Sequence, residues 1–159
     1  MDLAEQKIVE AVEVAEQESK KEPKLTEAKE QVATYVHMMG YILAHKKSWE
    51  KAASCYKKSI ELWQALNGEE NKKLIALWSD SAKFFELKGD LEESLLLLEK
   101  CEKVIVAEKG KNSKDYSALL VAKAQVANHK KDNVEAERLF KEAISCVEGT
   151  AGQVAPTKA

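Results

Sequence analysis

Apolar residues recur every three or four positions along most of the chain, and polar residues fill the positions between them. This spacing is the period of an amphipathic α-helix. The pattern breaks at turn-forming residues such as Asn67-Gly68, Gly89-Asp90 and Gly110. The pattern therefore predicts helices over seven segments: 3–20, 25–46, 48–66, 71–88, 90–108, 113–130 and 132–147.

Small side chains return at a fixed interval inside these segments. Ala52, Ser94 and Ala136 are equally spaced, because 94 − 52 and 136 − 94 both give 42, and we call this spacing the repeat interval. Two further series of small residues share it and bring the number of such positions to nine: Gly40, Ala82 and Ala124, and then Ser59, Cys101 and Ala143. Antiparallel helices approach closely where side chains are small, so we expect all nine positions to lie at helix contacts.

The starts of three predicted helices follow the same interval. Ser48, Asp90 and Asp132 each stand immediately ahead of a second helix and are separated by the repeat interval. Serine and aspartate are preferred N-cap residues because their side-chain oxygens accept hydrogen bonds from free backbone N–H groups. We therefore expect three caps in register. Repeats of this length are typical of arrays of stacked helices, which usually form binding surfaces.

Composition supports one all-helical domain. The chain has 159 residues with two prolines and six glycines among abundant helix formers. The 25 Lys and Arg residues nearly balance the 27 Asp and Glu residues and are spread along the chain, which argues against a nucleic-acid partner. No apolar run approaches the roughly 20 residues that span a bilayer, and the N-terminus lacks the features of a signal peptide. We expect a cytoplasmic protein without membrane insertion.

Candidate chemistry is sparse. Cys55, Cys101 and Cys146 are odd in number and widely spaced, so neither a disulfide nor a zinc site is indicated, and buried reduced thiols are expected. No phosphate loop, nucleophile elbow or carboxylate dyad occurs in the sequence. We therefore expect neither an enzyme nor a cofactor or metal.

The repeated motif resembles the tetratricopeptide repeat, in which Trp, Leu-Gly and Tyr of a first helix are followed by Ala and Phe of a second. The matching stretches are Val36-x-x-Met39-Gly40-x-x-Leu43 with Ala52-x-x-x-Tyr56, Trp78-x-x-Ser81-Ala82-x-x-Phe85 with Ser94-x-x-x-Leu98, and Leu120-x-x-Lys123-Ala124-x-x-Ala127 with Ala136-x-x-x-Phe140. Lys123 and Ala127 depart from the pattern. The interval is longer than the family's usual period of about 34 residues. It is similar to that of kinesin light chains, whose asparagine-rich first helices are not reproduced here.

The resemblance implies an all-α, right-handed superhelical solenoid of antiparallel helix pairs. Its expected organisation is an N-terminal helix or half repeat over 1–22, three repeats within 25–148 (about 25–68, 69–110 and 111–148) and a disordered tail over 149–159. Within the first helix we expect Ala4, Ile8 and Ala11 to repeat the small, large, small spacing of the later second helices.

In tetratricopeptide folds the first helix of each repeat lines a concave groove. By position, the resemblance assigns to that groove Thr34, His37, Tyr41, His45, Ser79, Lys83, Glu86, Gln125, Asn128 and His129. Tyr41 either covers aliphatic surface at the rim or anchors a partner side chain. The Lys and Asn of the clamp that holds chaperone tails are absent from their positions, so a chaperone-tail receptor is not indicated.

Two functions follow. The first is an adaptor or scaffold whose groove binds a peptide or helix of another protein. The alternative is a structural subunit that self-associates or docks into a larger assembly. It rests on the third repeat, where no further amphipathic helix follows to cover Phe140, Ile144 and Val147, so that these residues are expected to be exposed in a monomer or buried in a homodimer.

Overall fold

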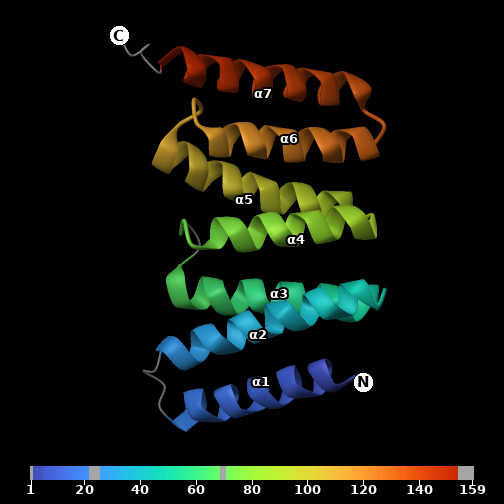
Figure 1. The fold of residues 1–159 in the computed structure, drawn as a ribbon, viewed down its shortest axis with the longest axis vertical. Helices are drawn as coiled ribbons and strands as arrows, with labels where there is room; N and C mark the ends of the chain where they lie inside the picture. The colour runs from blue at the N-terminus through green and yellow to red at the C-terminus, as the bar shows by residue number, and fades with distance from the viewer. Residues whose placement is uncertain (1, 22–25, 69–70, 154–159) are drawn as a thin grey trace, which may run out of the picture. The chain divides into compact units, whose positions relative to one another are not determined.

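The computed structural model describes residues 2–21, 26–68 and 71–153, and within them the chain forms helices and no strands (Figure 1). The helices are α1 (Leu3–Lys21), α2 (Thr26–His45), α3 (Trp49–Asn67), α4 (Leu74–Lys88), α5 (Leu91–Lys109), α6 (Lys114–His129) and α7 (Asn133–Gln153). Each predicted helix is present, and its ends lie within three positions of the prediction everywhere except at the end of α7. The all-α prediction is confirmed.

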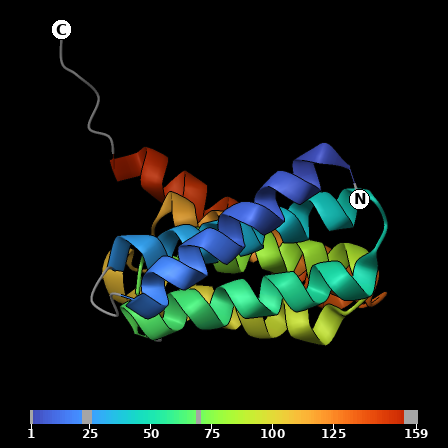
Figure 2. The ribbon, with the colours of Figure 1, turned by 90° about the horizontal axis from the view of Figure 1, so that it is seen from below.

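The chain divides into two compact units, Met1–Leu74 and Ile75–Ala159. In the first unit α2 packs against α3, and α1 lies along α2 (Figures 1 and 2). In the second unit α5 packs against α6, and α6 packs against α7 (Figure 1). Within each unit these packed helices are antiparallel because short connections join them, as expected for stacked helical hairpins.

The nine small positions are all buried, as predicted. Gly40 shows why size is restricted: a Cβ atom there would lie 3.1 Å from Cys55 Cβ and 3.2 Å from Tyr56 Cδ2. Ala52, Ser59 and Ser94 are 0% exposed. These positions lie where the helices approach most closely, so larger side chains would force the helices apart.

A hydrogen bond joins the two helices of each repeat at one register. Ala33, Ile75 and Ser117 are separated by the repeat interval on the first helices, and Ser59, Cys101 and Ala143 are their partners on the second. The bonds run from Ser59 Oγ to the Ala33 carbonyl (2.8 Å), from Cys101 Sγ to the Ile75 carbonyl (3.7 Å) and from Ser117 Oγ to the Ala143 carbonyl (3.1 Å). In the third repeat the donor has moved to the first helix, so the bond is kept although the residues differ.

The turn inside each repeat also recurs. Lys47, Gly89 and Lys131 have positive φ angles of 60°, 93° and 62°. The residue after each donates its backbone N–H to the carbonyl five residues earlier, at 2.8 to 2.9 Å: Ser48 to Leu43, Asp90 to Phe85 and Asp132 to Ala127. This is the left-handed helix termination that glycine adopts at least cost. Two of the three turns hold it with lysine.

Ser48 is the N-cap residue of α3, as predicted, but the side-chain cap bond expected at all three positions forms only at Asp90 and Asp132. Asp132 Oδ1 accepts a hydrogen bond from the Glu135 N–H at 3.1 Å, and Asp90 Oδ1 accepts one from the Glu93 N–H at 3.4 Å. Ser48 has a similar backbone conformation to Asp90 but makes no side-chain cap bond. The serine hydroxyl is one bond shorter than the aspartate carboxylate and does not reach the free N–H groups in this conformation.

Two further expectations need correction. Helix α7 continues to Gln153, so the predicted tail is wrong over 149–153, and residues 154–159 lie outside the described residues. Thr150 Oγ1 donates to the Cys146 carbonyl at 2.6 Å within this added turn. In α1, Ala4 is exposed whereas Ala15 is buried, so the small-residue register expected for a half repeat is not the one that packs.

Candidate functional site

The first helices of the second unit meet at a buried carboxylate. Glu86, on α4, has a side chain that is only 4% exposed, and its two oxygens contact nitrogen atoms of two different side chains. Lys83 Nζ lies 3.1 Å from Oε2, and His129 Nδ1, on α6, lies 3.1 Å from Oε1. The side chains of Lys83 and His129 are 53% and 51% exposed. We call Lys83, Glu86 and His129 the Glu86 cluster.

The helical period explains this arrangement. Lys83 and Glu86 are three residues apart on α4, so their side chains lie on one face of the helix. The remaining predicted site residues of this unit, Ser79, Gln125 and Asn128, are all exposed. Ser79 Oγ also lies 3.6 Å from Cys101 Sγ. The structure thus brings together three predicted residues, of which Glu86 is buried and orients the other two.

The predicted residues of the first unit lie along α2. Tyr41 is 57% exposed, and its ring packs edge-on against His45, with 4.4 Å between ring centroids. His37 is half-buried and contacts the ring of Tyr56 at a centroid distance of 5.1 Å. Thr34 is exposed, and its hydroxyl donates to the Glu30 carbonyl. Tyr41 and His45 therefore form an exposed aromatic pair, whereas His37 belongs to the packing of α2 against α3.

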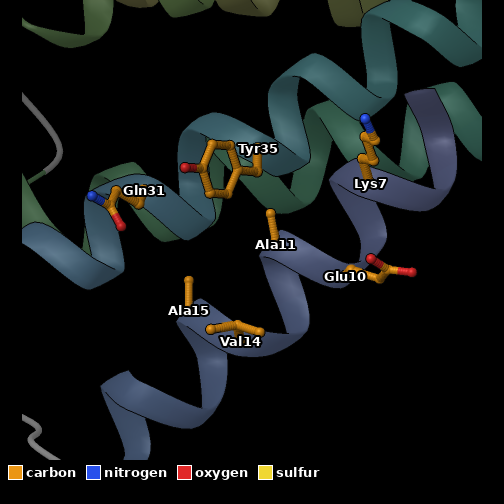
Figure 3. A pocket seen from close by; sticks show the side chains of 7 residues that line it. All are labelled: Lys7, Glu10, Ala11, Val14, Ala15, Gln31 and Tyr35. Carbon is orange, nitrogen blue, oxygen red and sulfur yellow. The ribbon is translucent and has the colours of Figure 1, made fainter. Parts of the chain in front are cut away.

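Sequence reasoning did not find a hollow between α1 and α2. It has a volume of about 330 Å³ (Figure 3) and is lined by Lys7, Glu10, Ala11, Val14, Ala15, Gln31 and Tyr35. Ala11 and Ala15 point from α1 toward α2 and leave space beside the ring of Tyr35 (Figure 3). The alanines four residues apart were the available signal. The sequence pattern instead grouped Ala11 with Ala4 and Ile8, so Ala15 and the space beside it were missed.

A second polar cluster explains why Lys123 departs from the repeat motif. Lys123 Nζ pairs with Glu102 across α5 and α6, and Tyr116 OH donates to Glu142 at 3.3 Å and to Glu102 at 3.5 Å. Burial, together with the negative charges of Glu142 and Glu102, raises the pKa of Tyr116 to about 12. The lysine therefore has an acidic partner on the neighbouring second helix, and the contact is structural.

Both units thus consist of antiparallel helix pairs that repeat one packing register, which defines a helical-hairpin repeat protein. Residues 30–105 match the model of the tetratricopeptide repeat family, and this match, together with the helix pairs, supports a tetratricopeptide-repeat protein. This fold generally mediates protein–protein interaction, and its members are generally non-catalytic scaffolds. No curated protein matches the sequence. Of the described helices, none is long and apolar enough to cross a membrane.

Solved structures share the fold at low sequence identity. BtubC (BKLC) from P. vanneervenii is 18% identical with a TM-score of 0.69, and the alignment covers 97% of this chain and 62% of that one. This chain therefore spans less than two thirds of that protein's length. Two crystal structures of a kinesin light chain-like protein of Podosopora anserina, with nearly identical TPR-like repeats, are 17% and 14% identical with TM-scores of 0.68 and 0.66. Their alignments cover 95% and 93% of this chain, and 72% and 77% of those chains.

Proposed function

We propose that the protein is an adaptor that holds a peptide or helix of a partner protein against the exposed faces of its first helices. The observation that carries the proposal is the Glu86 cluster. A carboxylate that is 4% exposed orients a lysine and a histidine side chain that are each about half exposed. Side chains that are already ordered lose less conformational entropy when a ligand binds, so such a surface is prepared for recognition.

The chemistry of this face favours carbonyl and carboxylate groups on the partner. An ammonium group has three N–H donors, so Lys83 retains donors besides the one directed at Glu86. Gln125 and Asn128 are exposed on α6 and carry amides, which can both donate to and accept from a peptide backbone. We therefore expect a partner segment with acidic side chains close to the Glu86 cluster.

The first unit offers a different kind of contact. Tyr41 is 57% exposed and is braced by His45, so it presents an ordered aromatic surface. Aromatic residues are enriched among the side chains that contribute most to binding. Of the two roles left open by the sequence, an anchor for an apolar partner side chain is the one proposed here.

The test uses a displayed library of random peptides selected against the full chain, followed by calorimetric titration of the enriched peptides. We expect the double variant Lys83→Ala/Gln125→Ala to bind them about tenfold or more weakly, which corresponds to about 1.4 kcal/mol. Tyr41→Ala tests the first unit by itself. The matched control is Lys100→Ala/Lys103→Ala, two exposed residues on the second helix α5.

Melting curves of Tyr41→Ala and of the α5 control should agree closely with the wild type, since the altered residues are exposed. The double variant should melt somewhat lower because it removes one partner of the buried Glu86 carboxylate, so circular dichroism confirms its helicity at the titration temperature. Enriched peptides that bind the double variant and Tyr41→Ala with wild-type affinity, but lose affinity for the α5 control, would move the binding surface to the second helices. A selection that enriches no binding peptide would contradict peptide recognition by this chain.

A further inference from the structure

Helix α7 carries an apolar face that nothing covers within the described residues. Phe140, Ile144 and Val147 are 40%, 56% and 52% exposed. They border a shallow hollow of about 290 Å³ that Val121 and Ala143 also line. Large exposed apolar side chains that lie together mark a contact surface more often than isolated ones do. The second unit itself shows what covers the corresponding surface one repeat earlier.

That surface belongs to α5. Leu98 and Ile105 stand one repeat interval before Phe140 and Val147, and both are 3% exposed because α6 packs over α5. Three ion pairs define the register of that packing: Glu92 with Lys130, Glu102 with Lys123, and Lys109 with Asp115. As residue numbers on α5 increase, the residue numbers of their partners on α6 decrease, so the two helices are antiparallel. Glu102 lies at the middle of this contact.

The residue of α7 that corresponds to Glu102, at the middle of the helix contact, is apolar. Ile144 stands one repeat interval after Glu102, so the charge that binds Lys123 on α5 is replaced by an aliphatic side chain on α7. A helix like α6, which directs Lys123 at the middle of the contact, would therefore place an unpaired charge against Ile144. The apolar face of α7 is therefore complementary to an antiparallel helix whose middle residue is also apolar.

A second copy of α7 has that property. A twofold axis between Ile144 and Ser145 brings the two Ile144 side chains together, and it places Lys141 opposite Glu148 of the partner subunit. Lys141 also pairs with Glu137 four residues earlier on its own helix. That pair is exposed and contributes little to stability, so it does not prevent Lys141 from turning to a partner.

We infer that the protein forms a twofold-symmetric dimer in which α7 packs antiparallel against α7 of a second copy, centred on Ile144. The contact extends the helix stacking of the second unit across the axis. This inference is independent of the proposed partner-binding face, because α7 carries none of the residues assigned to that face.

Sedimentation velocity of the full chain from low to high micromolar concentration tests the dimer. We expect a monomer–dimer equilibrium for the wild type and monomer alone for Ile144→Glu. The matched control is Val134→Glu, an apolar residue of α7 that is 82% exposed and lies ten residues from Ile144, where we expect wild-type dimerisation. Circular dichroism confirms that both variants keep their helices.

A charge exchange tests the register separately. Lys141→Glu and Glu148→Lys alone each place like charges opposite one another, so each should weaken the dimer. Both the double variant Lys141→Glu/Glu148→Lys and an equimolar mixture of the two single variants restore opposite charges and should restore the dimer. A wild type that stays monomeric throughout overturns the inference. So does a dimer that Ile144→Glu leaves intact, and failure of both charge exchanges overturns the antiparallel register.

Discussion

Replacing Lys131 by glycine should stabilise the protein. Lys131 has a φ of 62°, and it is exposed at the turn that ends α6. A residue with a Cβ atom loses about 1 to 2 kcal/mol in the left-handed region. Glycine avoids that cost but loses about 0.5 to 1 kcal/mol more backbone entropy on folding. The difference predicts a net gain of about 0.5 to 1 kcal/mol for Lys131→Gly.

The repeats supply matched comparisons. Lys47 has nearly the same backbone angle, at 60°, and is exposed as well, so Lys47→Gly should have an effect of similar size. Gly89 occupies the equivalent turn at 93°, and a Cβ atom there would meet nothing within 4 Å. Any loss from Gly89→Ala therefore reflects the backbone angle and no steric clash. We expect that loss to be about 1 kcal/mol.

Urea unfolding followed by helical circular dichroism measures these effects as shifts of the midpoint at constant slope. The slope matters because the protein has two compact units, and a changed slope would indicate that they no longer unfold together. Lys131→Gly with a lowered midpoint would refute the reasoning. It would show that the lysine side chain contributes more in the folded state than its backbone conformation costs.

Three further predictions concern the interior. Ala52→Trp should destabilise the protein by about 1 to 3 kcal/mol because Ala52 is 0% exposed, whereas Ala118→Trp at an exposed position should leave the melting temperature nearly unchanged. Cys101 should be alkylated more slowly than Cys55, and mass spectra recorded at timed intervals measure the two rates. Burial raises the pKa of both thiols, and Cys101 is the more deeply buried. Equal rates would show that the helices open freely. The pKa of Tyr116 is raised from 10 to about 12, so its contribution to stability is complete below pH 10 and is lost as the pH rises toward 12. Ultraviolet titration of the phenols should therefore show a last step that Tyr116→Phe removes, and an unchanged last step would place that pKa elsewhere.

The repeat register could be predicted because it is a steric requirement that restricts residue type. At the nine small positions only side chains up to the size of cysteine occur, and this size limit can be read directly from the amino-acid sequence. Trp78 and Phe85, both 0% exposed, fill the space that the small residues leave. Periodicity and size alone thus contain most of the information that specifies the helix pairs.

The errors arose where the outcome depends on geometry finer than residue type. Ser48 and Asp90 are both good capping residues, yet only the longer aspartate reaches a free N–H in this turn. The tail prediction took the residues from Gly149 onward as disordered because their sequence shows no helical period. At Gly149 the helix continues instead, and Gly68 and Gly110, with φ of 80° and 74°, are glycines that do end helices.

For the candidate site, position on a helix face was predictable and pairing was not. The resemblance placed Glu86 and Lys83 among the groove residues by their positions on the first helix of a repeat, and in the structure the two side chains contact each other. The second partner of Glu86, His129, lies far along the chain on another helix, and single-helix periodicity contains no information about which helices meet. The same limit applies to Lys123, which departs from the repeat motif and pairs with Glu102 on another helix.

The lysines of these two clusters differ in how much of each side chain is exposed. Lys123 is 18% exposed and is enclosed with its acidic partner, so its charge serves the contact between α5 and α6. Lys83 contacts a carboxylate that is just as buried as a core residue, but its own side chain remains 53% exposed. The difference in exposure has a direct consequence: a partner can still reach the ammonium group of Lys83, whereas binding to Lys123 would first require the helices to part. For this reason the proposed partner-binding surface follows α4 and α6 at Glu86 and does not extend to the pair of Lys123 and Glu102.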